Sequence, residues 1–208
     1  MIKVITAAPY NPVSLVEAKL WLREDGADQN NVITMLIKAM ANYAEHLTGR
    51  AFVQRTLELD LNAFYNASDA QYGQVIVLPH APLIGVDSIA YTDSDRTAQT
   101  LASSVYDADT VTTPGMIRLA YNQSWPVLGY GFNPVRIQYR AGYAPVGSPD
   151  DEAAYQAGIP NELKTWLHAR IATLYENREQ LMANTQIEIP RHFADGLLDS
   201  LIVGDRLF

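Results

Sequence analysis

The fold is decided by the stretch from Pro12 to Arg50, which reads PVSLVEAKLWLREDGADQNNVITMLIKAMANYAEHLTGR. Its first part predicts a short helix that begins after Ser14. Glu17 stands three residues later, so each of these two side chains can accept a hydrogen bond from the other residue's backbone N–H, as in a capping box. A polar run then ends this helix, and Gly26 suits the position just past a helix C-terminus.

A second, longer helix follows; Asp28 or Asn30 opens it and Thr48-Gly49 ends it. Its apolar residues recur with the 3.6-residue period of an α-helix and form one continuous stripe. The stripe consists of Val32, Ile33, Leu36, Ile37, Met40, Tyr43, Ala44 and Leu47. A lone helix with so long an apolar face is unfavourable in water, so another part of the chain must cover it.

The natural cover is a second stripe near the C-terminus, in a helix whose first turn contains Pro160. This stripe consists of Leu163, Trp166, Leu167, Ile171, Leu174 and Tyr175. We expect the two stripes to pack together, which makes the residues between them an insertion.

The inserted residues change to a period-2 pattern, in which apolar and polar side chains alternate from Val53 to Leu61. Turn signals separate further candidate strands at Gln74–Leu78, Val86–Thr92, Thr97–Leu101, Met116–Ala120 and Val135–Tyr139. The predicted fold is α+β: a helical bundle of residues 1–50 and 159–208, with a small antiparallel β module inserted at 51–148. Residues 149–158 are expected to form a polar linker.

Composition narrows the function classes. The 208 residues are 48% hydrophobic and 18% charged, as in ordinary globular proteins, and no apolar run is long enough to cross a membrane. There is no cysteine, which excludes disulfides, thiolate nucleophiles and cysteine-based metal sites. The net charge of −8 disfavours tight binding to nucleic acid, because affinity for its phosphates comes mainly from Lys and Arg.

Catalytic motifs are absent from the sequence. There is no GxGxxG, GxxxxGK[ST], GxSxG or HExxH pattern. His168 is expected to be an exposed or capping side chain, and neither a metal nor a cofactor is expected. A hydrolase would require Asp93, Asp95, Asp107 and His80 to converge in one cleft, so an enzyme is not the favoured interpretation.

The tyrosines allow a further hypothesis about function, that of a binding module. The chain has twelve, many of them between Tyr106 and Tyr143. The favoured interpretation is that their rings pack at the edge of a thin sheet. The competing hypothesis is a binding module that recognises carbohydrate or another tail protein.

An ordered set of motifs resembles the phage head–tail connector proteins, also called adaptor or head-completion proteins. The set covers nearly the whole chain up to Gln180. It consists of PVSLVEAKLWLR, AEHLTGRAF, QRTLELDL, VLPHAPLIGVDSIAYTD, YNQSWP, VRIQYRAGY and IPNELKTWLHARIATLYENRE. The chain is similar to the longer branch of that group, in which a β module interrupts the helices.

The resemblance implies a structural virion protein that is not an enzyme. Such proteins form a ring, usually of twelve copies, between the portal protein and a stopper or tail-completion protein, and DNA passes through the channel without specific binding. The expected location is the virion neck of a phage or prophage particle, after assembly in the host cytoplasm. In this family the C-terminal segment commonly docks on the portal. The corresponding candidate docking residues here are Ile187, Ile189, Phe193, Leu197, Leu198, Leu201 and Ile202.

Overall fold

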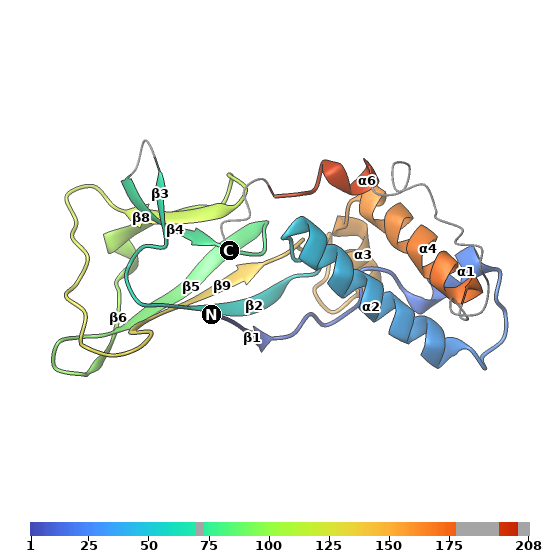
Figure 1. The fold of residues 1–208 in the computed structure, drawn as a ribbon, viewed down its shortest axis with the longest axis horizontal. Helices are drawn as coiled ribbons and strands as arrows, with labels where there is room; N and C mark the ends of the chain where they lie inside the picture. The colour runs from blue at the N-terminus through green and yellow to red at the C-terminus, as the bar shows by residue number, and fades with distance from the viewer. Residues whose placement is uncertain (70–72, 178–195, 204–208) are drawn as a thin grey trace, which may run out of the picture. The chain divides into compact units, whose positions relative to one another are not determined.

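A computed structural model describes residues 1–69, 73–177 and 196–203. These residues form two compact units (Figure 1). The β unit contains Met1–Pro9, Gln54–Tyr143 and Val203, and the helical unit contains the described parts of Tyr10–Val53 and Ala144–Ile202. Each unit is therefore assembled from segments that are far apart in the sequence.

The larger sheet of the β unit has five strands in the order β1-β2-β9-β5-β6, and all neighbours are antiparallel. The strands are β1 (Ile2–Thr6), β2 (Arg55–Leu61), β5 (Leu83–Thr92), β6 (Ala98–Thr100) and β9 (Val135–Ala141). The candidate strands at Val86–Thr92 and Thr97–Leu101 are present as β5 and β6, which pair as a hairpin.

The smaller sheet has four strands in the order β3-β4-β8-β7, again antiparallel. The strands are β3 (Ala67–Asp69), β4 (Gly73–Leu78), β7 (Tyr106–Asp109) and β8 (Gly115–Leu119), with a 3-10 turn η1 (Ser103–Val105) before β7.

The two sheets pack through apolar side chains that alternate with polar ones along the strands. On β9, for example, Val135, Ile137 and Tyr139 are fully buried. The Tyr139 hydroxyl donates a hydrogen bond to the Pro79 carbonyl oxygen at 3.0 Å. This bond ties the five-stranded sheet to the chain that leaves β4.

The helical unit contains α1 (Leu15–Leu22), α2 (Asn30–Thr48), α3 (Glu152–Gly158), α4 (Asn161–Glu176) and α6 (Gly196–Asp199). The packing of α2 against α4 is confirmed. The buried side chains at the core of this unit are Ile33, Ile37, Ala41, Ala44, Leu163, Trp166, Leu167 and Ile171. Every helix in the described part of the chain is too short or too polar to span a bilayer.

Some helix boundaries lie where the sequence predicted them, namely those set by a capping residue close by in the chain. The capping box of Ser14 and Glu17 is confirmed, and Gly49 ends α2 in the left-handed conformation at φ 69°. Arg23, not Gly26, takes the left-handed position after α1, at φ 56°. Helix α3 occupies much of the segment for which a linker was expected.

The expected fold class, a helical bundle with a small inserted β module, is wrong. The described residues form a sheet-rich structure that has two antiparallel sheets, with five and four strands, in addition to the helices. The N-terminal residues expected in the helical part form β1, and β3 and β7 lie where no strand was predicted. These three strands have only five, three and four residues, too few for a period-2 pattern to stand out, and they are stabilised by their partners in the sheets.

Candidate interaction surfaces

The segment between β8 and β9, residues 120–134, is an ordered loop that we call the apolar loop. Trp125 anchors it by stacking on Phe64, with ring centroids 4.8 Å apart and an interplanar angle of 5°. The Gly129 N–H donates to the Thr92 carbonyl oxygen at 2.9 Å. A side chain at Gly129 would place its Cβ 2.1 Å from the Asp93 carbonyl oxygen, so only glycine allows this close approach.

The far end of the apolar loop is anchored as well. The Asn133 N–H donates to the Asn62 Oδ1 atom at 2.9 Å, and the Pro134 carbonyl oxygen accepts from the Thr92 N–H at 2.8 Å. Leu128 also forms a β-bridge with Asp93, at the turn between β5 and β6. These contacts along the segment hold its backbone in one conformation.

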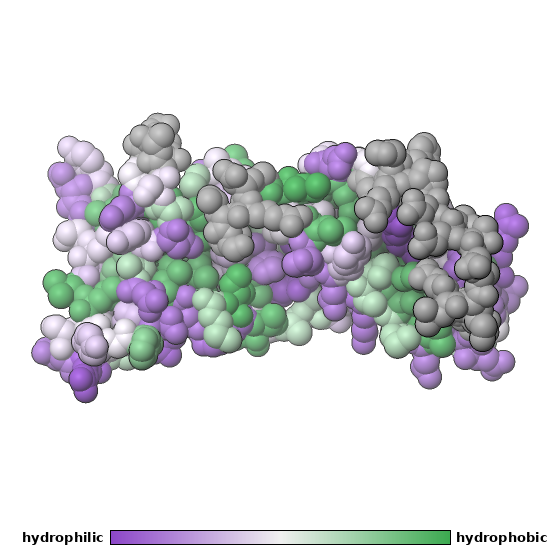
Figure 2. Space-filling view, in the orientation of Figure 1, coloured by the Kyte–Doolittle hydropathy of each residue, from purple (hydrophilic) through white to green (hydrophobic). Residues whose placement is uncertain are grey.

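Although its backbone is anchored, the apolar loop presents large apolar side chains to solvent. The exposed fractions are 90% for Tyr121, 77% for Val127, 96% for Tyr130 and 97% for Phe132. None of the residues from 120 to 134 is charged. Figure 2 shows apolar surface at the left of the view, where the chain between β8 and β9 runs in Figure 1. A rigid, uncharged group of exposed aromatic side chains is typical of a protein-interaction site.

The sequence contained a signal for this loop that motif reasoning missed. An uncharged stretch of this length stands out in an acidic chain, and its Gly, Pro and Asn residues indicate turns. Large apolar residues in such a stretch are either buried under the loop or exposed for binding. The sequence does not decide between these outcomes: Trp125 is partly covered by Phe64, whereas Phe132 is exposed.

The edge strand β1 is a second exposed apolar surface of the β unit. It pairs with β2 on one side, and in the described structure it is the outermost strand of its sheet. Val4 and Ile5 are 56% and 48% exposed. An edge strand with apolar side chains and an open edge is a ready site for another chain.

Helix α1 carries a third exposed apolar group, on the helical unit. Val16 and Leu20 are exposed, and Trp21 is half-exposed and stacks on His168 with ring centroids 5.0 Å apart. Tyr43, on α2 of the same unit, is likewise about half-exposed.

His168 is buried, so the expectation of an exposed or capping histidine is wrong. Its Nδ1 atom has no hydrogen-bond partner among the described residues, and desolvation lowers the pKa of the imidazole. Glu17 opposes this shift and Lys164 adds to it. The residues around His168 in the sequence do not indicate this burial, because the ring that covers it, Trp21, comes from α1.

The C-terminal docking residues divide into two groups. Ile187, Ile189 and Phe193 lie outside the described residues. Leu198 and Leu201 are buried within the helical unit, where α6 packs on α4, and the Leu201 carbonyl oxygen accepts from the Arg50 Nε–H. Leu197 is partly exposed and Ile202 is 43% exposed. Portal docking through these residues stays a prediction.

The acidic residues considered for hydrolysis serve local structure. The Asp93 carboxylate accepts hydrogen bonds from the Asp95 N–H, the Thr97 N–H and the Gln99 side chain. These bonds, above all the one from Thr97, lower the pKa of Asp93, although solvent around the exposed carboxylate weakens their effect. Asp107 lies on a different sheet, on β7, and its Oδ2 atom is 3.3 Å from Arg118 Nη2.

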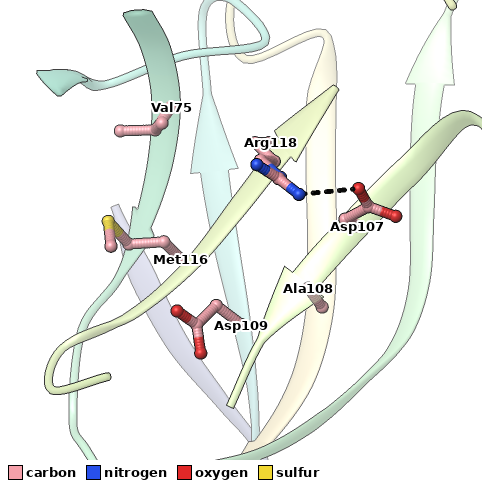
Figure 3. Close-up of a pocket in the computed structure, with 6 residues that line it drawn as sticks. All are labelled: Val75, Asp107, Ala108, Asp109, Met116 and Arg118. Carbon is pink, nitrogen blue, oxygen red and sulfur yellow. Dashed lines mark ion pairs between the residues drawn. The ribbon is translucent and has the colours of Figure 1, made fainter. Parts of the chain in front are cut away.

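A depression of about 250 Å³ lies on the four-stranded sheet. Figure 3 shows its lining, in which Asp107 and Arg118 point toward each other and form an ion pair. Among the described residues, the lining consists of Val75, Asp107, Ala108, Asp109, Met116 and Arg118, none of which is aromatic. Asp109 is engaged by the backbone N–H groups of the following turn, which lower its pKa. In the described part of the chain, no three acidic or histidine side chains gather as a metal site would require.

Comparison with known proteins identifies the fold. No family model and no curated protein sequence matches this chain. A chain in a structure described as the virion of a native gene transfer agent particle matches with a TM-score of 0.75 and 19% identity, over 99% of this chain and 96% of that chain. Chains in the necks of empty and native particles, computed with C6 and C12 symmetry, match over the same shares at 20% identity, with TM-scores of 0.75 and 0.67. The chain therefore shares its fold, nearly from end to end, with chains of gene transfer agent particles.

Proposed function

We propose that this chain is a structural protein of the neck of a phage-like particle. The observation that carries the proposal is the extent of the fold match, which covers 99% of this chain and 96% of a chain from such a neck. A match of that extent leaves little of the molecule for another role. The ordered motifs that resemble head–tail connector proteins support the same interpretation independently of the coordinates.

Within the neck, we assign the chain the role of head–tail adaptor. Copies of the chain would form a ring, with twelve copies as the expected number, between the portal protein and the stopper or tail-completion protein. The C12 symmetry of one matching neck is consistent with this number. The acidic net charge of −8 suits a ring whose channel lets DNA pass without binding it.

The surfaces of the two units suit a building block. A head-to-tail ring requires two different complementary patches on each copy. Exposed apolar groups are present on the apolar loop, on β1 and on α1. We also propose that the chain is not an enzyme, because two of the carboxylates considered for hydrolysis are engaged elsewhere, Asp93 in a turn and Asp107 in an ion pair.

The alternative of a carbohydrate-binding module has weaker support. The most exposed aromatic side chains lie on the apolar loop, and the described residues that line the depression on the four-stranded sheet are not aromatic. Sugar recognition by stacking requires aromatic faces around a site.

The test is electron microscopy and mass measurement of the full chain, concentrated alone and mixed with its portal protein. We expect rings of one defined copy number that bind the portal end-on. Failure to form any complex with the portal across a range of salt concentrations would refute the adaptor role.

A further inference from the structure

We infer that the apolar loop of one copy packs against the β1 edge of the next copy, and that this contact builds the ring. The inference rests on the proposed function, since it presupposes an assembly of identical chains. It adds the identity of the two surfaces that meet, which neither the fold match nor the resemblance supplies.

The positions of the two surfaces carry the first part of the argument. In the strand order β1-β2-β9-β5-β6, the strands β1 and β6 form opposite edges of one sheet. The apolar loop crosses the end of this sheet: it is held to Asn62, just after β2, and to Thr92 and Asp93 at the end of β5, so it is a surface separate from the β1 edge. Both surfaces belong to the same compact unit. A head-to-tail ring requires two unlike patches on one body, and the apolar loop and the β1 edge are two such patches.

The chemistry of the two surfaces also matches. The apolar loop has no charge, and the charged side chain of β1, Lys3, is already paired: its Nζ atom lies 2.6 Å from Asp60 Oδ2 and 3.4 Å from Glu58 Oε1. Val4 and Ile5 offer apolar surface beside it. Contact between the loop and β1 would bury no unpaired charge, which is the usual cost of an interface.

The size of the loop surface fits a protein partner. Its four exposed side chains hold roughly 600 Å² if an aromatic side chain carries about 150–250 Å². A stable interface takes about 800 Å² from each partner, so the apolar loop supplies most of one side. Tyr and Phe on an anchored backbone lose little conformational freedom on binding.

Insertion into a lipid bilayer is the competing use of such a loop, and the observations disfavour it. Membrane-binding segments combine apolar side chains with Lys or Arg that attract anionic headgroups. The apolar loop has neither Lys nor Arg.

The absence of cysteine from the chain permits a direct test. Val4→Cys or Ile5→Cys is combined with Tyr130→Cys or Phe132→Cys in four double variants, because a disulfide forms only between closely approaching Cβ atoms. The concentrated full chain is oxidised and run on a non-reducing gel. We expect at least one double variant to give a ladder of covalent multimers that disappears on reduction, while each single variant stops at the dimer.

The matched control places the second cysteine outside the apolar loop, at a similarly exposed apolar residue next to the four-stranded sheet. Val111 is 90% exposed, in the segment between β7 and β8. Ile5→Cys combined with Val111→Cys should give no ladder beyond the dimer. A ladder of equal length in this control would mean random collision and would overturn the inference.

A second measurement does not depend on disulfide geometry. Phe132→Ser should raise the protein concentration needed for ring formation at least tenfold, as expected for an aromatic residue at the centre of an interface, whereas Val111→Ser should leave it unchanged. Both positions are exposed in the single chain, so neither change should affect folding.

The outcomes separate the inference from the proposed function. Rings that form without any loop-to-β1 cross-link, and that tolerate Phe132→Ser, overturn the inference and leave the adaptor role standing. Absence of any ring, alone or with portal, overturns both. Binding of the chain to phosphatidylcholine–phosphatidylglycerol vesicles that is lost in Phe132→Ser would reassign the loop to lipid and overturn the inference alone.

Discussion

Replacing Tyr139 with phenylalanine tests how the two sheets of the β unit are held together. Tyr139 is fully buried on β9, and its hydroxyl donates to the Pro79 carbonyl oxygen at 3.0 Å. Tyr139→Phe removes one oxygen atom and leaves the ring in place. A hydrogen bond of this kind contributes about 1 kcal/mol, and a buried carbonyl left without a donor costs about 1–3 kcal/mol. We expect a loss of about 1.5 kcal/mol in the free energy of unfolding, which corresponds to a fall in Tm of roughly 3–6 °C for a chain of this size.

The assay is urea unfolding followed by circular dichroism and tryptophan fluorescence, with Tyr121→Phe as the matched control. Tyr121 is 90% exposed, so the same atomic change there should shift stability by less than about 0.5 kcal/mol. Burial also raises the pKa of the Tyr139 phenol, so the stability that depends on its protonated form is lost as the pH rises above the ordinary value of 10.0. The difference between the native chain and Tyr139→Phe should therefore shrink in alkali. Equal unfolding midpoints for Tyr139→Phe and Tyr121→Phe at neutral pH would refute the reasoning.

Three further predictions concern other parts of the two units. Gly115→Ala would place a Cβ 2.5 Å from the Cβ of Leu83, so we expect a loss of about 1–3 kcal/mol by thermal unfolding. Leu83→Gly removes that Cβ and should therefore destabilise the Gly115→Ala chain less than it destabilises the native one. Because burial lowers the pKa of His168 below 6.5, stability should fall as the pH drops from 6.5 towards the lowered pKa. His168→Phe should flatten this pH dependence, which is measured as urea unfolding midpoints at about pH 7.5 and about pH 5. An unchanged slope in the variant would contradict the prediction. Ser14→Ala removes the cap of α1 and should cost about 1 kcal/mol, whereas Ser14→Asp should retain most of the stability; equal losses in the two variants would argue against capping.

Features that depend on near neighbours in the chain were predictable from the sequence. The capping box at Ser14 and Glu17 and the glycine end of α2 depend on residues a few positions apart, and both were predicted. The packing of α2 against α4 was also predictable, because each carries a long apolar stripe that the other can cover.

The short strands were not predictable, and this is why the fold class was wrong. Strands β3 and β7 pair with the next strands along the chain but are too short for their own pattern to show, whereas β1 pairs with β2 about fifty residues away. The polar position of His168 on α4 likewise gave no sign that Trp21 covers it. Local pattern cannot report which distant segment arrives at a given edge or face.

The sequence by itself determined the capping box of α1, the glycine end of α2, the two stripes that pack together, the longer strands and the uncharged character of residues 120–134. Only the tertiary structure decided that β1 completes a sheet edge and that Tyr130 and Phe132 point into solvent while Trp125 stacks on Phe64. The physical reason is the range of the interactions: caps and helical periodicity act within a few residues, whereas exposure is the surface that remains after all distant segments have packed.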